Sequence, residues 1–376
     1  MPFGIYVHVP FCASRCGYCD FNTYTATELG NSVTRDSFHE VLIDEIRYAR
    51  SAAGDREVDT VFFGGGTPTL LEAYALNEIL AAISEEFGLA PDAEVTTEAN
   101  PDSVDAAKLA ALREGGFTRI SLGMQSSSSK VLQVLDRTHT PGSSSAMARA
   151  ARAVGFEHVN LDLIYGTPGE SDDDLRRSLD EVLDAGVDHV SAYSLIVEQG
   201  TPLARKVARG EIAEPDDDVA AGRYELVDEV LKDAGFDWYE VSNWAQPGGE
   251  CRHNLAYWRN TDWWGIGPGA HSHIAGERWW NHKHPATYAD ALTRGGSPAA
   301  DREVLTAEQI QTEAVMLGVR LAEGMPVAEI PASSRTAAAA LVGRGLLNGE
   351  ALLSGRIQLT DAGRLLADGV VRELLA

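Results

Sequence analysis

The sequence predicts an α/β protein in which six parallel strands alternate with helices, followed by an aromatic-rich extension and a small winged-helix-like domain. Strand-like and helix-like segments alternate from residue 4 to residue 196. Polar or otherwise unusual residues stand at the end of each of the six strands. The composition then changes, because all seven tryptophans lie within residues 238–280.

Short apolar runs predict the strands, and apolar residues at helical spacing predict the helices between them. The predicted strands are 4–9, 58–63, 94–98, 119–123, 159–165 and 189–196. The predicted helices are 36–50, 72–87, 104–114, 128–135, 143–154 and 172–185. Strand–helix units in series predict parallel pairing through right-handed crossovers. Six units are too few for an eight-fold barrel, so a partial (βα)6 barrel and a doubly wound sheet both fit. In either, ligands bind at the carboxyl ends of the strands.

The remaining chain predicts an extension and a separate small domain. Residues 201–235 are helical and charged, and the tryptophan-rich stretch closes at the loop signal Gly295-Gly296-Ser297-Pro298. A strand-like piece at 355–360 leads into a helix at 361–375. We therefore expect three domains, at 1–200, 201–300 and 301–376. From residue 305 onward six arginines and no lysine stand beside eight acidic residues, so we predict an interaction or lid domain rather than a DNA-binding one.

Charge and hydropathy narrow the class of function. The chain carries 31 basic and 56 acidic residues, a net charge of −25, which disfavours nucleic acid and anionic membranes. No run approaches the roughly 18 apolar residues of a membrane span, and no basic leader precedes Arg15. We expect a cytoplasmic protein with no nucleic-acid partner and at most transient membrane contact.

Three of the four cysteines, Cys12, Cys16 and Cys19, form the pattern C-x3-C-x2-C directly after the first strand. Thiolates select iron–sulfur clusters, zinc or copper(I). A cubane cluster is normally closed by four cysteines, so three thiolates leave one iron open to another ligand. A Cys3His zinc site that includes His8 is an alternative, although structural zinc would not explain the residues at the other five strand ends. A disulfide would leave an odd cysteine.

The other strand ends carry groups that suit a polar ligand. They are Gly64-Gly65-Gly66-Thr67-Pro68, Glu98, Gln125, Asp162 and Ser194. A glycine run lets backbone approach a ligand closely, although many ordinary turns contain one. Glu98 suits a cationic ligand or could cap a helix, and Asp162 in an apolar strand needs a partner to be tolerated.

The cysteine pattern after the first strand resembles the signature of the radical S-adenosylmethionine superfamily. The resemblance implies a [4Fe–4S] cluster on Cys12, Cys16 and Cys19. It also implies S-adenosylmethionine on the open iron, cleaved by one electron to a 5′-deoxyadenosyl radical. The implied S-adenosylmethionine contacts are Tyr6, Tyr18, Gly65, Gly66, Thr67, Glu98, Gln125, Arg137 and Asp162. Among these, Tyr18 would lie against adenine and Arg137 would pair the methionine carboxylate, although a lone arginine is usually a solvated surface charge.

Longer stretches resemble the oxygen-independent coproporphyrinogen III oxidase family over nearly the whole chain. They include Tyr6-Val7-His8-Val9-Pro10-Phe11-Cys12, Gly123-Met124-Gln125-Ser126 and Asp162-Leu163-Ile164-Tyr165-Gly166. The true oxidases carry a fourth cysteine, C-x3-C-x2-C-x-C, where this chain has Phe21. The resemblance is therefore to the haem-chaperone branch. It implies delivery of haem to respiratory proteins and disfavours coproporphyrinogen III dehydrogenase activity.

Residues 251–258 contain H-N-x-x-Y-W, a motif that in this branch is associated with haem. Imidazole is a ready axial ligand for haem iron, and aromatic rings stack on porphyrin faces. We expect His253 to ligate haem, with His271 and His273 as weaker candidates. The alternatives are a packed histidine and a plain aromatic core over the barrel, and Cys251 is expected to be a free or packed thiol. Three functions stay open: haem chaperone, coproporphyrinogen III dehydrogenase, and a zinc-stabilised α/β scaffold.

Overall fold

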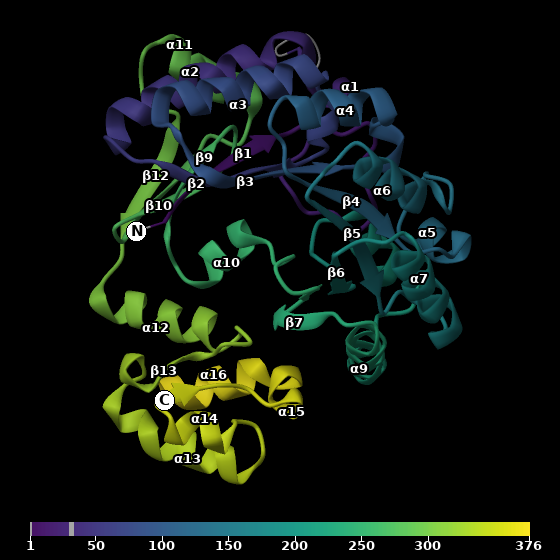
Figure 1. Ribbon diagram of the computed structural model, residues 1–376, viewed down its shortest axis with the longest axis vertical. Helices are drawn as coiled ribbons and strands as arrows, with labels where there is room; N and C mark the ends of the chain where they lie inside the picture. The colour runs from purple at the N-terminus through teal and green to yellow at the C-terminus, as the bar shows by residue number, and fades with distance from the viewer. Residues whose placement is uncertain (1, 30–33) are drawn as a thin grey trace.

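A computed structural model describes residues 2–29 and 34–376, in which a curved 12-stranded mixed sheet carries helices on its outer face (Figure 1). The strand order is β12-β11-β10-β9-β1-β2-β3-β4-β5-β6-β8-β7. The six central strands are β1 (Phe3–Val9), β2 (Val58–Gly65), β3 (Leu89–Ala99), β4 (Arg119–Gln125), β5 (His158–Tyr165) and β6 (His189–Ser194). They pair in parallel in chain order, which confirms the predicted strand–helix units.

The helices between these strands cover the outer face because each presents an apolar stripe to the sheet. They are α1 (Ala26–Leu29), α2 (Phe38–Ala53), α3 (Ala73–Phe87), α4 (Ala106–Glu114), α5 (Ser129–Val134), α6 (Ser143–Ala153) and α7 (Asp172–Asp184). In α3 the buried stripe includes Leu76, Ile79 and Ile83. It meets an apolar face of the sheet, to which β1 contributes the fully buried Ile5 and Val7.

Two predicted helices are interrupted. The helical stretch predicted at 201–235 forms α8 (Pro202–Ala208) and α9 (Asp217–Asp233), because Thr201 and Asp216 each cap a new start with a side-chain hydrogen bond. The helix predicted at 361–375 forms α15 (Asp361–Leu365) and α16 (Ala367–Leu375), which meet at Leu366. The strand predicted from 94 begins earlier, at Leu89, where it pairs with Val58.

The tryptophan-rich stretch adds strands to both edges of the central sheet. These strands are β7 (Asp237–Glu240), β8 (Asn243–Ala245), β9 (Asp262–Ile266), β10 (His271–Ile274), β11 (Glu277–Asn281) and β12 (Ala299–Val304). β8 pairs with β6, and β9 pairs in parallel with β1. Helix α10 (Arg252–Trp258) joins β8 to β9, so it crosses the opening between the two edges and lies in the hollow of the sheet (Figure 1).

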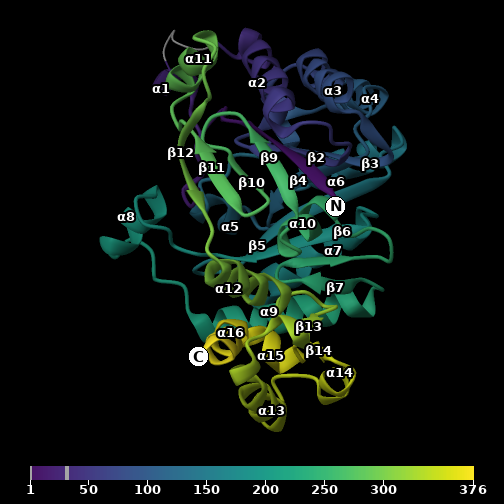
Figure 2. The same cartoon turned by 90° about the vertical axis from the view of Figure 1, so that its left-hand side faces the viewer.

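The C-terminal elements form a second, smaller core below α9 (Figure 2). After α11 (Pro285–Thr293), they are α12 (Ala307–Gly318), β13 (Met325–Pro326), α13 (Arg335–Gly343), α14 (Gly349–Leu353), β14 (Arg356–Ile357), α15 and α16. β13 and β14 pair as a two-stranded antiparallel sheet, and Val315, Leu341 and Leu374 are buried among these helices. The domain boundaries at 200 and 300 stay a prediction.

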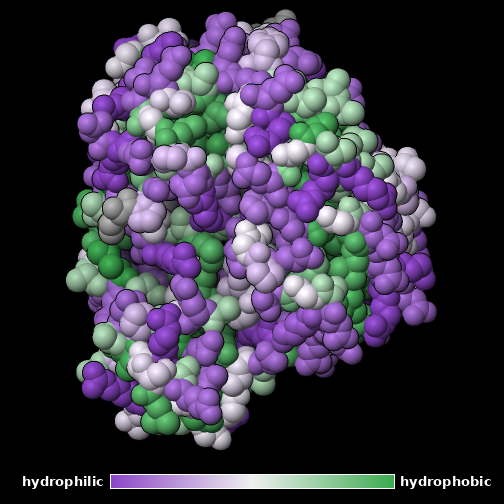
Figure 3. Space-filling model, viewed as in Figure 1, coloured by the Kyte–Doolittle hydropathy of each residue, from purple (hydrophilic) through white to green (hydrophobic). Residues whose placement is uncertain are grey.

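The surface agrees with the acidic composition. The face in Figure 3 is mostly hydrophilic, with separate apolar patches. No helix within residues 2–29 and 34–376 combines the length and the apolar character needed to cross a bilayer.

Candidate functional site

The three cysteines lie on one loop between β1 and α1, and each is partly buried. The loop is anchored near its start and in its middle by backbone hydrogen bonds. The Cys12 amide donates to the Tyr24 carbonyl at 3.0 Å. Gly17 donates to the Leu135 carbonyl at 3.2 Å and accepts from the Leu203 amide at 2.8 Å. The cysteine loop is thus fixed against the segments that follow β4 and β6.

Burial acts on two of these thiols, and a charged side chain contacts the third. Burial raises the pKa of Cys12 to about 11 and also raises the pKa of Cys19. At Cys16, Nη1 of Arg137 donates a 3.4 Å hydrogen bond to Sγ. Iron binds the thiolate, and a bound cation favours deprotonation further. Three thiols on one anchored loop beside a guanidinium therefore fit an iron–sulfur cluster.

The zinc alternative is not formed by these side chains. Within residues 2–29 and 34–376, no three His, Cys, Asp or Glu side chains are grouped to share one metal ion. His8 is engaged at both ring nitrogens, Nδ1 with the Tyr6 hydroxyl at 3.0 Å and Nε2 with the Asn22 carbonyl at 2.9 Å. A cubane cluster offers a separate iron to each thiolate, so its ligands need not share an ion.

The glycine turn after β2 packs against the cysteine loop. Gly65 has a φ of 107°, and a Cβ at Gly66 would collide with the Phe11 carbonyl. The Gly66 amide donates to the Val9 carbonyl at 2.8 Å, and the Thr67 amide donates to the Phe11 carbonyl at 2.7 Å. The glycines thus bring the end of β2 into contact with the end of β1. Their predicted contact with a bound methionine stays a prediction.

Glu98 and Asp162 line one interior cavity of about 200 Å³. Burial, and then the neighbouring Asp162, raise the pKa of Glu98 to about 8. Burial also raises the pKa of Asp162, although the Ser121 hydroxyl and the Asn160 amide donate to it at 3.0 Å and 2.6 Å. Two buried carboxylates in one cavity favour a cationic ligand, because a nearby positive charge stabilises both.

The other predicted contacts surround this cavity and the cysteine loop. Tyr6 lines the cavity beside Phe62. Tyr18 lies by the cysteines, and burial raises its pKa. Gln125 is buried at the end of β4, with a left-handed φ of 63°. The residues predicted to contact S-adenosylmethionine therefore lie around one cavity and the cysteine loop. The role of each residue stays a prediction.

His253 is buried inside the cavity at the start of α10. Its Nδ1 pairs with the Thr60 hydroxyl at 2.8 Å, and its Nε2 pairs with the Tyr257 hydroxyl at 3.0 Å. Burial lowers the pKa of His253 to about 4. Its backbone amide donates to Glu94 at 3.0 Å, and Glu94 is held by Arg119 at 3.0 Å. Haem ligation by His253 stays a prediction, and it requires one of the two ring hydrogen bonds to break.

The weaker candidates lie on β10. His271 is exposed and stacks on Trp280 with ring centroids 5.8 Å apart. His273 is buried beside Trp263, with its Nδ1 3.3 Å from the Thr261 carbonyl. Cys251 is a buried thiol that donates to Glu94 at 3.4 Å, as expected for a packed cysteine.

The sequence analysis missed three residues of the site. Asn100 bridges Thr67 and Arg137, with hydrogen bonds of 3.0 Å and 2.7 Å. Asn160 and Tyr193 line cavities at the sheet rim. Asn160 could have been found, because residues two apart on a strand face the same side and Asp162 follows it.

Two family models match separate parts of the chain. Residues 6–182 match the Radical SAM superfamily, and residues 305–366 match the HemN C-terminal domain. The solved structure of coproporphyrinogen III oxidase (HemN) from Escherichia coli has a TM-score of 0.85, with 99% of this chain and 90% of that chain covered at 23% identity. The α/β fold predicted from the sequence is confirmed by this likeness.

Curated relatives match over most of the chain. Heme chaperone HemW of Mycobacterium tuberculosis is 56% identical over 374 residues, which cover 100% of this chain and 95% of that protein. Heme chaperone HemW of Synechocystis is 36% identical, with 89% and 82% covered. Mouse radical S-adenosyl methionine domain-containing protein 1, mitochondrial, is 38% identical, with 75% and 63% covered. These likenesses confirm the family resemblance predicted from the sequence.

Proposed function

This chain belongs to the HemW family of heme chaperones within the radical SAM superfamily, and from that premise we propose that it is itself a haem chaperone. It holds a [4Fe–4S] cluster and S-adenosylmethionine, binds haem, and hands the haem to respiratory haem proteins. One observation carries the proposal: the 56% identity to heme chaperone HemW of Mycobacterium tuberculosis spans both cores. The net charge of −25 favours protein partners over nucleic acid. We place the protein in the cytoplasm, with transient membrane contact at delivery.

The cysteine loop and its surroundings would hold the cofactors. Cys12, Cys16 and Cys19 supply the thiolates, and the cluster when bound supplies an open iron site and one electron. Glu98 and Asp162 stabilise the cationic part of S-adenosylmethionine in the interior cavity. Arg137 orients the loop by bonding Cys16 from the ends of β3 and β4.

The rival function is dehydrogenation of coproporphyrinogen III. The solved oxidase shares only the fold, at 23% identity. The position of the oxidases' fourth cysteine is Phe21 here, which is 61% exposed and offers no thiol. We therefore treat this activity as an outcome of the test.

Anaerobic reconstitution separates these functions. The protein is loaded with iron and sulfide, and haem is added before an apo-haem protein. In a parallel reaction, coproporphyrinogen III is added with S-adenosylmethionine and dithionite. We expect four irons per chain, stoichiometric haem that transfers to the acceptor, and no decarboxylation. Rapid conversion of coproporphyrinogen to protoporphyrinogen would refute the chaperone proposal.

Two variants test the assigned ligands. Cys16→Ser is expected to lose most of the iron, whereas Cys251→Ser, which changes a buried thiol away from the loop, is expected to retain it. Full iron content in Cys16→Ser contradicts the cluster assignment. For haem, a Soret band that His253→Ala leaves unchanged removes His253 as a ligand.

A further inference from the structure

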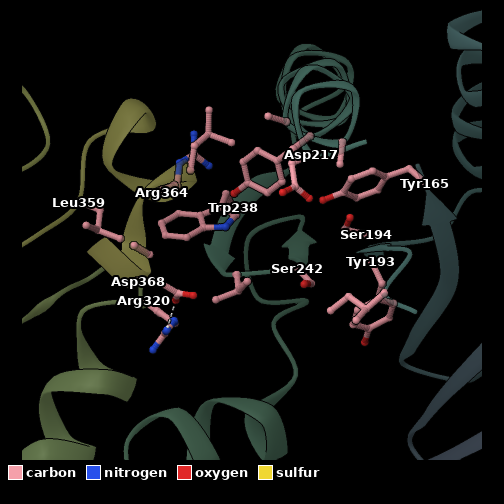
Figure 4. A pocket seen from close by; sticks show the side chains of 17 residues that line it. Tyr165, Tyr193, Ser194, Asp217, Trp238, Ser242, Arg320, Leu359, Arg364 and Asp368 are labelled. Carbon is pink, nitrogen blue, oxygen red and sulfur yellow. Dashed lines mark hydrogen bonds and ion pairs between the residues drawn. The ribbon is translucent and has the colours of Figure 1, made fainter. Parts of the chain in front are cut away.

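An apolar groove lies between the rim of the sheet and the C-terminal core. One part, about 430 Å³, is enclosed by the end of β6, by α9 and by α15 and α16 (Figure 4). The other part, about 480 Å³, runs along α10 and α12. The two parts share Tyr193, Val241 and Ser242. We propose that this groove is the haem-binding site, an inference that rests on the function proposed above.

Exposed apolar side chains gather at this groove. Of the 12 large apolar residues exposed within residues 2–29 and 34–376, four line its first part: Tyr193, Ile196, Val241 and Leu365. Ile196 is 65% exposed at the end of β6. Contiguous exposed apolar surface on a protein marks a binding site. A ligand that covers these apolar side chains removes them from water, which favours its binding.

The shape and the rings of the groove suit a flat aromatic ligand. Tyr165, Tyr193 and Trp238 project into the first part from β5, β6 and β7 (Figure 4). Aromatic rings stack favourably on other π faces. Sites for small molecules are mostly apolar clefts of about 300–1,000 Å³, so each part has the size of such a site. We expect the two parts together to accommodate a porphyrin macrocycle.

The charges of the groove favour a ligand with few carboxylates. Arg320 is ion-paired with Asp368 at 2.5 Å, and Arg364 is ion-paired with Asp228 at 2.8 Å. Asp217 also lines the groove, so its lining residues offer no unpaired cation. A tetracarboxylate such as coproporphyrinogen III would meet repulsion there. Haem carries two carboxylates at one edge, which can remain at the open rim in water.

The groove also reaches the H-N-x-x-Y-W motif and the interior cavity. Asn254, Tyr257 and Trp258 line its second part. Tyr193 and Tyr257 line the interior cavity as well, together with Glu98. Haem in the groove would therefore sit beside the motif and next to the predicted cofactor chamber.

Placing a carboxylate inside the groove tests the proposal. Wild-type protein, Val241→Glu and Ile196→Glu are titrated with haem by absorbance. Val304→Glu is the matched control, since Val304 is 74% exposed on β12 and does not line the groove. We expect at least tenfold weaker haem binding for both groove variants and unchanged binding for the control. Equal thermal midpoints and iron contents verify that the variants are folded.

The outcomes separate this site from the proposed function. Wild-type haem affinity in both groove variants overturns the groove while the chaperone function stands. No haem binding by the wild-type protein overturns the function itself. Metal-free protoporphyrin IX is expected to compete with haem, and coproporphyrinogen III is expected not to compete. Stronger binding of coproporphyrinogen III than of haem would overturn haem as the occupant.

Discussion

Arg137 donates a hydrogen bond from Nη1 to Sγ of Cys16 at 3.4 Å. Its Nη2 donates to the Asn100 side chain at 2.7 Å and to the Gly123 carbonyl at 3.1 Å. The guanidinium therefore ties the second cysteine of the loop to the ends of β3 and β4. Burial would lower the pKa of Arg137, but nearby Tyr18 and Cys16 outweigh it and raise the value. The side chain is thus a fixed positive charge beside the thiolate.

Replacing Arg137 should lower the reduction potential of the bound cluster. A unit charge about 5 Å away at an effective dielectric constant near 20 contributes about 3 kcal/mol. We expect Arg137→Gln to make the potential more negative by on the order of 100 mV, measured by an anaerobic redox titration followed by electron paramagnetic resonance. Arg113→Gln, which removes a half-buried arginine on α4, is the control. An unchanged potential in Arg137→Gln contradicts this role.

Glu98 should make S-adenosylmethionine binding depend on pH. Because its pKa is about 8, the carboxyl is mostly protonated at pH 7 and becomes an anion as the pH rises to 9. We expect Glu98→Gln to bind S-adenosylmethionine roughly tenfold more weakly at pH 9, about 1.4 kcal/mol, and with less loss at pH 7. Anaerobic calorimetry with Glu85→Gln as an exposed control measures this difference. The same loss at both pH values would show that the charge of Glu98 is not involved.

Glu45 should link stability to pH. It is fully buried and accepts from the Gly267 amide at 2.7 Å, the Asn281 amide at 2.8 Å and the Tyr288 hydroxyl. Burial raises its pKa to about 7. The unfolded chain therefore releases this proton at lower pH than the folded one, so stability is lost as pH rises from about 4.5 to 7.

The size of this loss can be measured against a variant. The shift corresponds to about 3 kcal/mol at most. We expect Glu45→Gln to reduce the fall in free energy of unfolding between pH 5 and pH 8, measured by urea denaturation. Parallel pH profiles for the two proteins would contradict the raised pKa.

Arg364 should hold the C-terminal core to the rest of the molecule. Its side chain is 4% exposed, donates to both Asp228 oxygens at 3.0 Å and 2.8 Å, and lies 4.5 Å from the Trp238 ring centroid. Removing Arg364 leaves the Asp228 carboxylate with Lys232 at 2.8 Å and the Trp244 indole at 2.9 Å, so the loss is about 1–3 kcal/mol. We expect Arg364→Ala to speed proteolysis after residue 304, compared with exposed Arg335→Ala. Equal cleavage rates would contradict this contact.

The six central strands could be predicted because helices cover their outer face and most of their residues are buried. Val58, Val61 and Phe63 of β2 read as an apolar run without knowledge of their partners. β12 carries Asp301, Arg302 and Glu303 at a sheet edge, so no such run marks it. Its identity as a strand depends on pairing with β11.

At the candidate site, too, local sequence predicts some residues, whereas others depend on contacts between distant parts of the chain. Cys16, which follows β1, and Glu98, at the end of β3, could be assigned from their place at the carboxyl ends of strands, where parallel sheets bind ligands. The contact of Arg137 with Cys16 could not be predicted from the sequence, because 121 residues separate the two side chains. It depends on how the turn after α5 packs on the cysteine loop. His253 was assigned from a motif, and only the packing of α10 shows that Thr60 and Tyr257 occupy its ring nitrogens.

Helix α10 also has a mechanical consequence. It forms a strap across the open side of the curved sheet, since it connects β8 on one side of the six central strands to β9 on the other. Glu94 fastens the first turn of the strap to the inner wall through the Arg252 and His253 amides. Pulling the β8 side and the β9 side of the sheet apart would stretch this strap and break both hydrogen bonds to Glu94. The open side of the sheet is therefore closed by the chain itself, whereas the C-terminal core is joined to α9 by side-chain contacts such as the Arg364–Asp228 pair.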